Sequence, residues 1–349
     1  MCHPPAEQDG VAPRRGKILS LTRMRESVSS ECGSARTVRA VPCAPSMSAA
    51  RTKPHRRVRK LGPTQPYLTG GLRDAFDAWL AGAVDRHTAG LAFREVRKGA
   101  QALSWLYVER RGEVDLAAHT IDGRGKRAAL CTYYAPLHFL TAHHALAAVD
   151  PARLGAARRL VDLGAGTGAA GAAAARAFGV ADATAIDRSG FALAEARRTY
   201  AAFGLLARTV RGRLPAALPR AEAGDLWVLG WSANEMTARD RDELLERLVR
   251  AIGFGARVVL LEPLAGAAVP WWPAWRDVLT PLGVIEHECK VPVALPEWIA
   301  RLDKASGLDH RVLGARLLAG PLGPAPDRSA PSAPRSPLAS GSLRGKRRS

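Results

Sequence analysis

Residues 159–176 have the sequence RLVDLGAGTGAAGAAAAR, and this stretch predicts the fold around which the chain is organised. Residues 160–163 form a short apolar strand, residues 164–168 a turn with glycine at alternate positions, and the alanines that follow a helix. The glycines Gly164, Gly166 and Gly168 let the backbone turn sharply and leave no side chain between it and a ligand. The first N–H groups of the helix then point toward a polar or anionic group.

The strand of this stretch contains an acid, Asp162, and a second acid, Asp187, follows 25 residues later at the end of the next predicted strand. A glycine-rich turn also occurs for packing alone. Two acids at this spacing favour a cofactor site at the turn instead.

Downstream of the turn, strands alternate with amphipathic helices. This alternation predicts an α/β fold with a doubly wound, mostly parallel, seven-stranded Rossmann-like sheet. The expected strands are residues 160–163, 183–187, 207–211, 225–230, 257–262, 284–291 and 311–318. Ser189 and Thr237 are expected to cap the helices after the second and fourth strands. Upstream, residues 70–149 place apolar side chains at helical spacing, and Pro136 should kink the third helix or mark its first turn.

The formal net charge of the 349 residues is +19, and it is concentrated at the two ends. Residues 1–60 contribute +9 and residues 320–349 contribute +5, so the body carries the remaining +5. Both ends are rich in Pro, Ser and Arg without apolar periodicity, which predicts disordered basic tails. The predicted organisation is a tail at 1–60, a helical N-terminal subdomain at 61–150, a cofactor-binding domain at 151–320 and a tail at 321–349.

The N-terminal tail suggests two further hypotheses. Residues 1–46 are interpreted as an upstream mis-start before Met47, with an organellar transit peptide as the alternative. The basic run 53–60 is expected to contact RNA phosphates, with a solvated tail as the alternative.

The five cysteines include no CxxC pair or other metal-ligand spacing, so no metal site is expected. Cys131 and Cys289 are expected to be ordinary thiols in a reducing compartment. The sequence has no run of about 18 apolar residues and no apolar core of a signal peptide, so we predict no membrane span and a cytoplasmic location.

Two cofactors compete for the glycine turn. A nicotinamide fingerprint can be placed on Gly166, Gly168 and Gly171, but it puts Asp162 inside the strand, where an unpaired buried carboxylate is costly. The alternative register leaves Asp162 at the edge of the strand, facing a cationic ligand. S-adenosylmethionine has both an ammonium and a sulfonium group and suits that acid.

Residues 161–168 resemble motif I of the class I S-adenosylmethionine-dependent methyltransferases, with Asp162 at the acidic position and Gly164, Gly166 and Gly168 at the glycines. The resemblance implies that Asp187 holds both ribose hydroxyls, since a carboxylate accepts two O–H bonds. It also implies that residues 225–236 position the methyl acceptor. Family members often have an acid after the third strand for the adenine amine, whereas this chain has Val-Arg-Gly-Arg at 210–213, so backbone groups or another residue are expected to bind adenine.

A narrower resemblance involves the helical lead-in and residues 231–236, 261–263 and 302–310. These are similar to the Rsm22-like group of ribosomal small-subunit-associated methyltransferase-like proteins. Members often carry a cysteine cluster, implicated in iron–sulfur binding, after the fifth strand. This chain has only Cys289 there, so no cluster is expected.

The acceptor side of the site is predicted from the fourth strand. Methyl transfer from a sulfonium is an in-line displacement, so positioning supplies much of the acceleration. Asn234 is predicted to hold an acceptor N–H and Glu235 to accept a proton, with a polar helix cap as the alternative. Trp231 is predicted to stack at the site and Tyr134, or its neighbour Tyr133, to cover a ligand in the turn, with core packing as the alternative. His138, His143 and His144 lack a partner at metal spacing and are interpreted as surface or core residues.

The sequence therefore favours an S-adenosylmethionine-dependent methyltransferase that acts on RNA or a component of the ribosomal small subunit. One alternative is a non-catalytic ribosome-assembly protein that retains the cofactor pocket. The other is a small-molecule methyltransferase with incidental basic tails.

Overall fold

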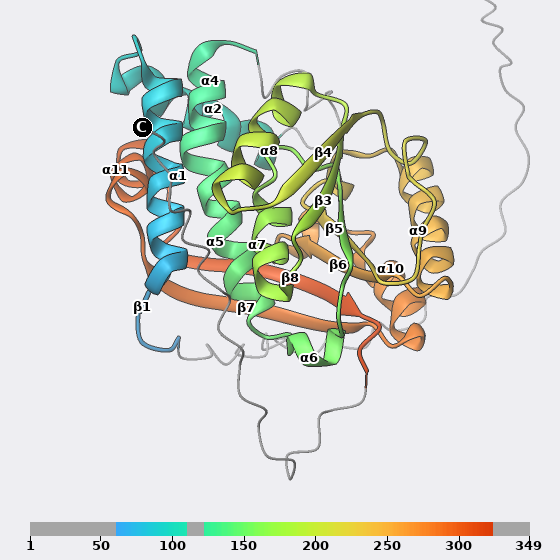
Figure 1. Cartoon of the computed structure of the whole chain (residues 1–349). Coiled ribbons are helices and arrows are strands. Elements are labelled where there is room, and N and C mark those ends of the chain that lie inside the picture. The colour runs from blue at the N-terminus through green and yellow to red at the C-terminus, as the bar shows by residue number, and fades with distance from the viewer. Residues whose placement is uncertain (1–60, 110–121, 324–349) are drawn as a thin grey trace, which may run out of the picture. The chain divides into compact units, whose positions relative to one another are not determined.

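The computed structural model describes residues 61–109 and 122–323, and an eight-stranded sheet runs through them (Figure 1). Its order is β1-β7-β8-β6-β5-β2-β3-β4, with neighbours parallel except that β8 runs antiparallel to β6 and β7. The strands are β1 Gln65–Pro66, β2 Arg159–Leu163, β3 Asp182–Asp187, β4 Leu206–Arg211, β5 Asp225–Gly230, β6 Arg257–Glu262, β7 Ile285–Ala294 and β8 Val312–Gly320.

The predicted mostly parallel Rossmann-like sheet is confirmed, with eight strands rather than seven. The additional strand, β1, pairs with β7 through only two residues. Two residues are too few to produce an alternating pattern, so the sequence did not reveal it.

Helices cover both faces of the sheet, and a separate core lies on each face. Successive strand residues point to opposite faces, so Leu160 of β2 joins one core and Val161 joins the other. In Figure 1 the helices α9 Ala238–Gly253 and α10 Trp272–Leu279 lie on one side of the sheet. The helices α1 Gly70–Thr88, α5 Ala135–Leu146, α7 Ala169–Phe178 and α8 Gly190–Ala202 lie on the other.

Both predicted helix caps are confirmed. The Ser189 hydroxyl accepts from the N–H of Ala192 at the start of α8, at 3.2 Å. The Thr237 hydroxyl accepts from the N–H of Asp240 at the start of α9, at 3.1 Å. Each hydroxyl satisfies one of the four backbone donors that a helix leaves unpaired at its N-terminus.

The N-terminal part of the described chain is helical, as predicted, but its third helix is interrupted. The helices are α1, α2 Phe93–Glu109, α4 Arg124–Ala129 and α5, and a π turn at Leu130–Tyr134 joins α4 to α5. Pro136 explains the interruption, since it has no N–H to donate and its ring collides with the carbonyl four residues earlier in an α-helix. The N–H of Ala135 instead bonds to the carbonyl of Leu130, five residues back.

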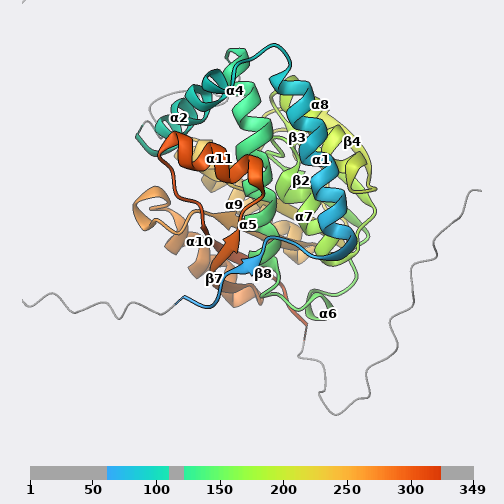
Figure 2. The same ribbon diagram turned by 90° about the vertical axis from the view of Figure 1, so that its left-hand side faces the viewer.

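The short helix α6 Pro151–Leu154 precedes β2. The described chain ends with helix α11 Glu297–Ser306 and strand β8. From the side, α11 crosses next to α2 and close to the π turn (Figure 2). Residues more than 150 positions apart in the sequence therefore meet at one end of the molecule.

The mis-start, the basic run 53–60 and the predicted tails, apart from residues 321–323, lie outside the described residues. Cys131 and Cys289 are buried free thiols. Across residues 61–109 and 122–323, no helix combines the length and the apolar character that crossing a bilayer requires.

Candidate active site

The site forms at the point where the order of the parallel strands reverses. Strand β2 lies between β3 and β5, and the chain continues from these strands to helices on opposite faces. The carboxyl ends of such strands leave a crevice in which α/β proteins bind ligands. Here the three ends carry the glycine turn, Asp187 and Trp231.

The glycine turn spans residues 164–168, between the end of β2 and the start of α7. Gly164, Gly166 and Gly168 all have a positive φ, at 66°, 52° and 78°. A Cβ on Gly164 would lie 2.5 Å from the Cβ of Ser232, whereas a Cβ on Gly166 would meet nothing within 4 Å. The backbone of Gly166 therefore borders open space, where a ligand can approach it closely.

Strand β2 ends at Leu163, so it does not run past Gly164 as the nicotinamide register requires, and Gly171 lies within α7. A Cβ at Gly171 would overlap the carboxylate of Asp162. Gly171 is therefore required for packing between the helix and the strand below it.

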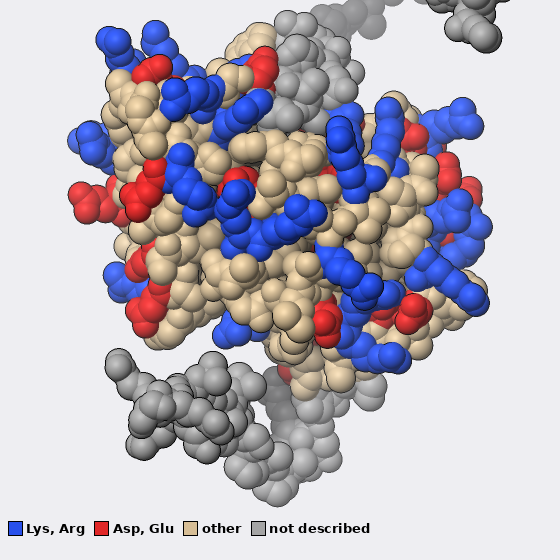
Figure 3. Space-filling view, turned by 45° about the horizontal axis from the view of Figure 1, so that its top comes forward, with Lys and Arg blue, Asp and Glu red and all other residues tan. Residues whose placement is uncertain are grey.

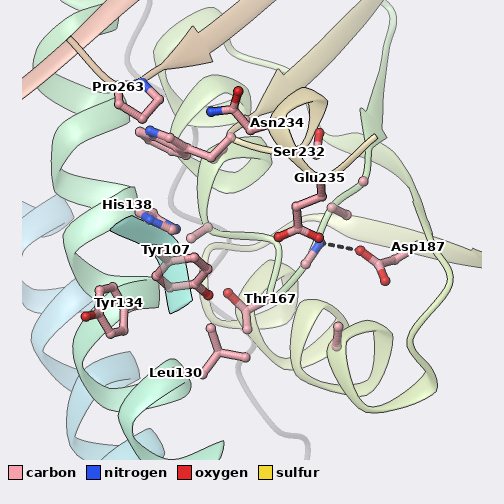
Figure 4. A pocket seen from close by; sticks show the side chains of 18 of the residues that line it. Tyr107, Leu130, Tyr134, His138, Thr167, Asp187, Ser232, Asn234, Glu235 and Pro263 are labelled. Atoms are coloured by element: carbon pink, nitrogen blue, oxygen red, sulfur yellow. Dashed lines mark hydrogen bonds between the residues drawn. The ribbon is translucent and has the colours of Figure 1, made fainter. Parts of the chain in front are cut away.

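Asp187 ends β3 and faces the turn. Its Oδ2 accepts from the N–H of Gly166 at 2.9 Å, and its Oδ1 accepts from the N–H of Ser189 at 2.7 Å (Figure 4). These two bonds fix the carboxylate at the edge of the cavity. A carboxylate offers about four lone-pair sites, so Asp187 still has acceptors for two ribose hydroxyls.

Asp162 does not face the cavity, and in this respect the prediction is corrected. Its residue is 1% exposed, and its Oδ2 accepts from the Tyr200 hydroxyl at 2.5 Å beneath α7. Burial, together with the charge of Asp187, raises the pKa of Asp162 to about 7 despite the Tyr200 and Gly171 hydrogen bonds. Asp162 is thus a buried, hydrogen-bonded acid that supports the turn from below.

A cavity of about 570 Å³ extends from the glycine turn to strand β8. Most of the predicted site residues line it, namely Gly164, Gly166, Asp187, Trp231, Tyr134, Asn234 and Glu235. Asp162 and Gly168 do not; Gly168 lies against α8, where a Cβ would be 3.1 Å from the Cα of Ala196. A cavity of this size accommodates a nucleoside-sized cofactor with part of a second ligand.

Trp231 follows β5 in a strained conformation. Its φ of 57° makes it the one non-glycine residue with a left-handed backbone among those described. Its N–H donates to the carbonyl of Leu261 at 2.8 Å, and its ring stacks on His138 with centroids 4.4 Å apart and planes 13° apart. Such strain collects at functional sites and persists only where surrounding contacts hold it.

Asn234 and Glu235 lie on one wall of the cavity (Figure 4). The amide of Asn234 donates to Glu262 Oε2 at 2.9 Å and accepts from Trp271 Nε1 at 3.0 Å. Its orientation is therefore fixed by the protein, which leaves one N–H and one lone pair for an acceptor. Figure 4 shows Glu235 on the side of the cavity where Asp187 lies.

The opposite wall comes from the helical lead-in. Tyr134 presents its ring to the cavity, while its hydroxyl donates to the carbonyl of Ala100 at 3.0 Å. Tyr107 packs against it with ring centroids 5.3 Å apart. Burial, with the charge of Glu235, raises the pKa of Tyr107 far above its usual range, so this hydroxyl stays protonated.

Several lining residues were not predicted from the sequence. They are Thr167 in the turn, Ser104 and Tyr107 on α2, His138 on α5, Arg213 after β4 and His310 before β8. Thr167 lies within the glycine motif and was open to inference from it. Residues 212–214 also line the cavity, and Arg213 pairs with Asp240 at 2.9 Å.

One group of metal-ligand side chains occurs among the described residues, away from this cavity. His87, Cys131 and Glu195 bring their ligand atoms within 4.8 Å of one another. The Glu195 carboxylate already pairs with Arg198 at 2.8 Å and with Arg86 at 3.5 Å. Two guanidinium groups beside the carboxylate oppose a cation, so we assign no metal to this group.

The cavity fits S-adenosylmethionine. Asp187 has free acceptors for the ribose hydroxyls, and the Gly166 backbone leaves the room that a Cβ would fill. The geometry does not support a direct cofactor contact for Asp162 or Gly168, since neither residue lines the cavity.

Comparisons with known proteins agree with this geometry. A family model described as "Methyltransferase domain" matches residues 160–255. No curated protein sequence matches the chain.

Solved structures with a similar arrangement include the mitomycin 7-O-methyltransferase MmcR, at 16% identity, with 72% of this chain and 75% of that chain covered and a TM-score of 0.41. A SAM-dependent methyltransferase from Geobacter sulfurreducens, in complex with S-adenosyl-L-homocysteine, is 18% identical over 54% of this chain and 91% of that chain, with a TM-score of 0.34. A ribosomal protein L11 methylase from Lactobacillus delbrueckii subsp. bulgaricus is 16% identical over 53% and 76%, with a TM-score of 0.31.

None of the comparisons supports the narrower resemblance to the Rsm22-like group. The family match agrees with the order of the strands in the sheet and with the glycine turn that follows β2. Residues 160–255 are therefore similar to the methyltransferase-domain family, within a Rossmann-like sheet whose glycine turn fits S-adenosylmethionine.

Proposed function

We propose that this chain transfers the methyl group of S-adenosylmethionine to a base of RNA, with RNA of the ribosomal small subunit as the first candidate. The observation that carries this proposal is the aromatic wall of the cavity. Trp231, His138, Tyr107 and Tyr134 line the part of the cavity beyond the glycine turn. Flat rings of this kind accommodate a planar heterocycle, and single RNA bases are commonly held by aromatic side chains.

The charge of the protein supports a polyanionic partner. The sequence carries a formal net charge of +19, and Figure 3 shows Lys and Arg side chains spread over one face of the described chain, with fewer acidic side chains. Arg188 and Arg213 line the cavity itself. A basic surface around a cavity attracts phosphates and brings a nucleotide to the site.

The donor would be held by the residues already described. When bound, S-adenosylmethionine supplies an electrophilic methyl group on a sulfonium. Asp187 would bind the ribose hydroxyls, and the Gly166 backbone would border the cofactor. The cofactor would then occupy the end of the cavity near the turn and leave the aromatic end for the acceptor.

A second candidate is a small aromatic molecule as the acceptor. The cavity volume of about 570 Å³ supports it, since a drug-sized ligand needs a cavity of roughly 300–1,000 Å³. Such an acceptor would use the same aromatic wall but would not need the basic surface.

Transfer of labelled methyl groups tests the proposal. The full-length protein and S-adenosylmethionine are incubated separately with RNA, protein and small-molecule extracts. We expect label in RNA, with a rate that falls steeply as salt is added, because phosphate contacts are screened. Label in the small-molecule fraction alone would refute the RNA acceptor. Cofactor binding without transfer to any fraction would favour the non-catalytic assembly protein.

A further inference from the structure

We propose that His310 is the proton acceptor of the transfer, with Asp303 and Tyr133 as the residues that position it. This inference rests on the proposed methyltransferase function but not on the identity of the acceptor. His310 lies in the turn between α11 and β8, and it lines the same cavity as the glycine turn. An acceptor that carries an N–H or O–H proton needs such a group when the methyl group is transferred.

The imidazole of His310 is held by a buried carboxylate. Its Nδ1 lies 2.7 Å from Asp303 Oδ1, and its backbone N–H donates to Asp303 Oδ2 at 3.0 Å. The side chain of Asp303 is 7% exposed, whereas that of His310 is 37% exposed. A carboxylate only accepts hydrogen bonds, so Nδ1 carries the proton and Nε2 keeps its lone pair.

Tyr133 completes the support. Its hydroxyl donates to Asp303 Oδ1 at 2.5 Å and lies 2.9 Å from His310 Nδ1. Burial acts to raise the pKa of Asp303, but hydrogen bonds from His310 and Tyr133 outweigh it and hold that pKa below its usual value. The carboxylate is therefore charged and can stabilise a protonated imidazole beside it.

The fold brings these three residues together from distant parts of the sequence. Tyr133 belongs to the π turn, Asp303 to α11, and His310 to the turn before β8. Because α11 crosses close to the π turn, the hydroxyl of Tyr133 reaches a carboxylate 170 positions away (Figure 2). Neither Asp303 nor Tyr133 lines the cavity, so their role toward the acceptor is exerted through His310.

The other histidine of the cavity is a poor proton acceptor. Burial, and then the proximity of His310, lowers the pKa of His138 to about 4. Its ring is also packed flat against Trp231. No carboxylate contacts it among the interactions of the described residues, whereas His310 has Asp303 behind it.

The acceptor heteroatom forms a bond to the methyl carbon as the carbon–sulfur bond breaks, which yields S-adenosylhomocysteine. The proton of the acceptor passes to Nε2 of His310. The resulting imidazolium is neutralised by Asp303 and returns its proton to solvent through its exposed edge.

The test compares His310→Ala with His287→Ala, a control that removes an exposed histidine from β7. Labelled-methyl transfer is measured on whichever fraction the wild type labels, and S-adenosylhomocysteine affinity is measured for every variant. We expect His310→Ala to lower kcat by about 100-fold or more, the usual share of general acid–base catalysis, with KM and cofactor affinity changed less than about threefold. His287→Ala should behave as the wild type.

Three further variants separate catalysis from folding. In His310→Gly, added imidazole should restore part of kcat, which a structural role would not allow. Asp303→Asn should lower kcat by about tenfold at unchanged KM, and Asp303→Glu should recover part of it, because a carboxylate is again behind the ring.

The outcomes distinguish this inference from the proposed function. If the wild type labels protein or small molecules instead of RNA, the RNA acceptor is wrong and the histidine variants are scored on that fraction. If His310→Ala keeps kcat within about threefold of the wild type, His310 is not the proton acceptor. A wild type that labels no fraction would overturn both.

Discussion

Replacing Asp187 with Asn tests the assignment of the cofactor end of the cavity. Both oxygens of Asp187 already accept backbone N–H groups, from Gly166 and Ser189, so the side chain is fixed where the ribose is expected. Asn removes the charge and turns one acceptor into a donor. A hydrogen bond to a charged group contributes about 1.5–3 kcal/mol, and one such bond to the ribose should be lost outright. At about 1.4 kcal/mol per tenfold change, the Kd should rise by roughly 10- to 150-fold.

The assay is calorimetric titration of S-adenosylhomocysteine, which keeps the ribose and avoids turnover. Asp182→Asn is the matched control, since Asp182 is exposed at the other end of the same strand. Thermal unfolding of each variant shows whether the glycine turn is intact. A folded Asp187→Asn variant that binds within about twofold of the wild type would refute the ribose assignment.

Three predictions concern stability. The pKa of Asp162 is about 7 in the folded protein and about 4 in the unfolded chain. Protonated Asp162 therefore contributes its full stabilisation below pH 4, and this contribution is lost as the pH rises to 7. In chemical denaturation, the unfolding free energy of the wild type relative to Asp162→Asn should therefore fall by on the order of 3 kcal/mol between pH 4 and 7 and stay level above; a pH-independent difference would contradict the raised pKa. Asp225→Ala removes a 2%-exposed carboxylate that Arg159 contacts at 3.1 and 2.8 Å. It should lower the unfolding free energy in urea by about 2–4 kcal/mol, which is less than for a fully buried pair because the Arg159 guanidinium is partly in water. A cost below about 1 kcal/mol would show that water replaces the carboxylate. Trp272→Ala removes a fully buried side chain at the start of α10 and should cost about 3–5 kcal/mol by the same method; a cost below about 1 kcal/mol would contradict this packing role.

The sheet could be predicted because its central strands β2, β5 and β6 are buried on both faces and because the strands alternate with amphipathic helices. Each of the seven longer strands was located within a few residues of its observed bounds. The glycine turn and Asp187 were also accessible, because they follow their strands directly and strand ends of a parallel sheet meet at one edge.

The orientation of Asp162 could not be predicted in the same way. Its neighbours Val161 and Leu163 both point into the core beneath α9 and α10, so the side chain of Asp162 must point to the other face, under α7. Which face carries the ligand depends on tertiary packing and not on the pattern within one strand. The sequence also gave no sign of Tyr200, its hydrogen-bond partner.

The His310 cluster was beyond sequence reasoning for a different reason. Tyr133 and Asp303 are 170 positions apart, and they meet because α11 crosses the lead-in. The lone histidine before β8 has no motif around it that indicates a role. Pairing at this distance becomes visible only when the topology is known.

The π turn at Leu130–Tyr134 has a consequence for how this chain tolerates changes in length. The turn directs two adjacent side chains to different places: the hydroxyl of Tyr133 donates to Asp303, and the ring of Tyr134 faces the cavity. Deleting one residue from the turn would change the register of α4 against α5 and rotate α4 by about 100° relative to α5. One of the two tyrosines would then lose its place without any change in the glycine turn. A one-residue deletion here should therefore separate acceptor chemistry from cofactor binding, although the amino-acid composition of the cavity stays almost the same.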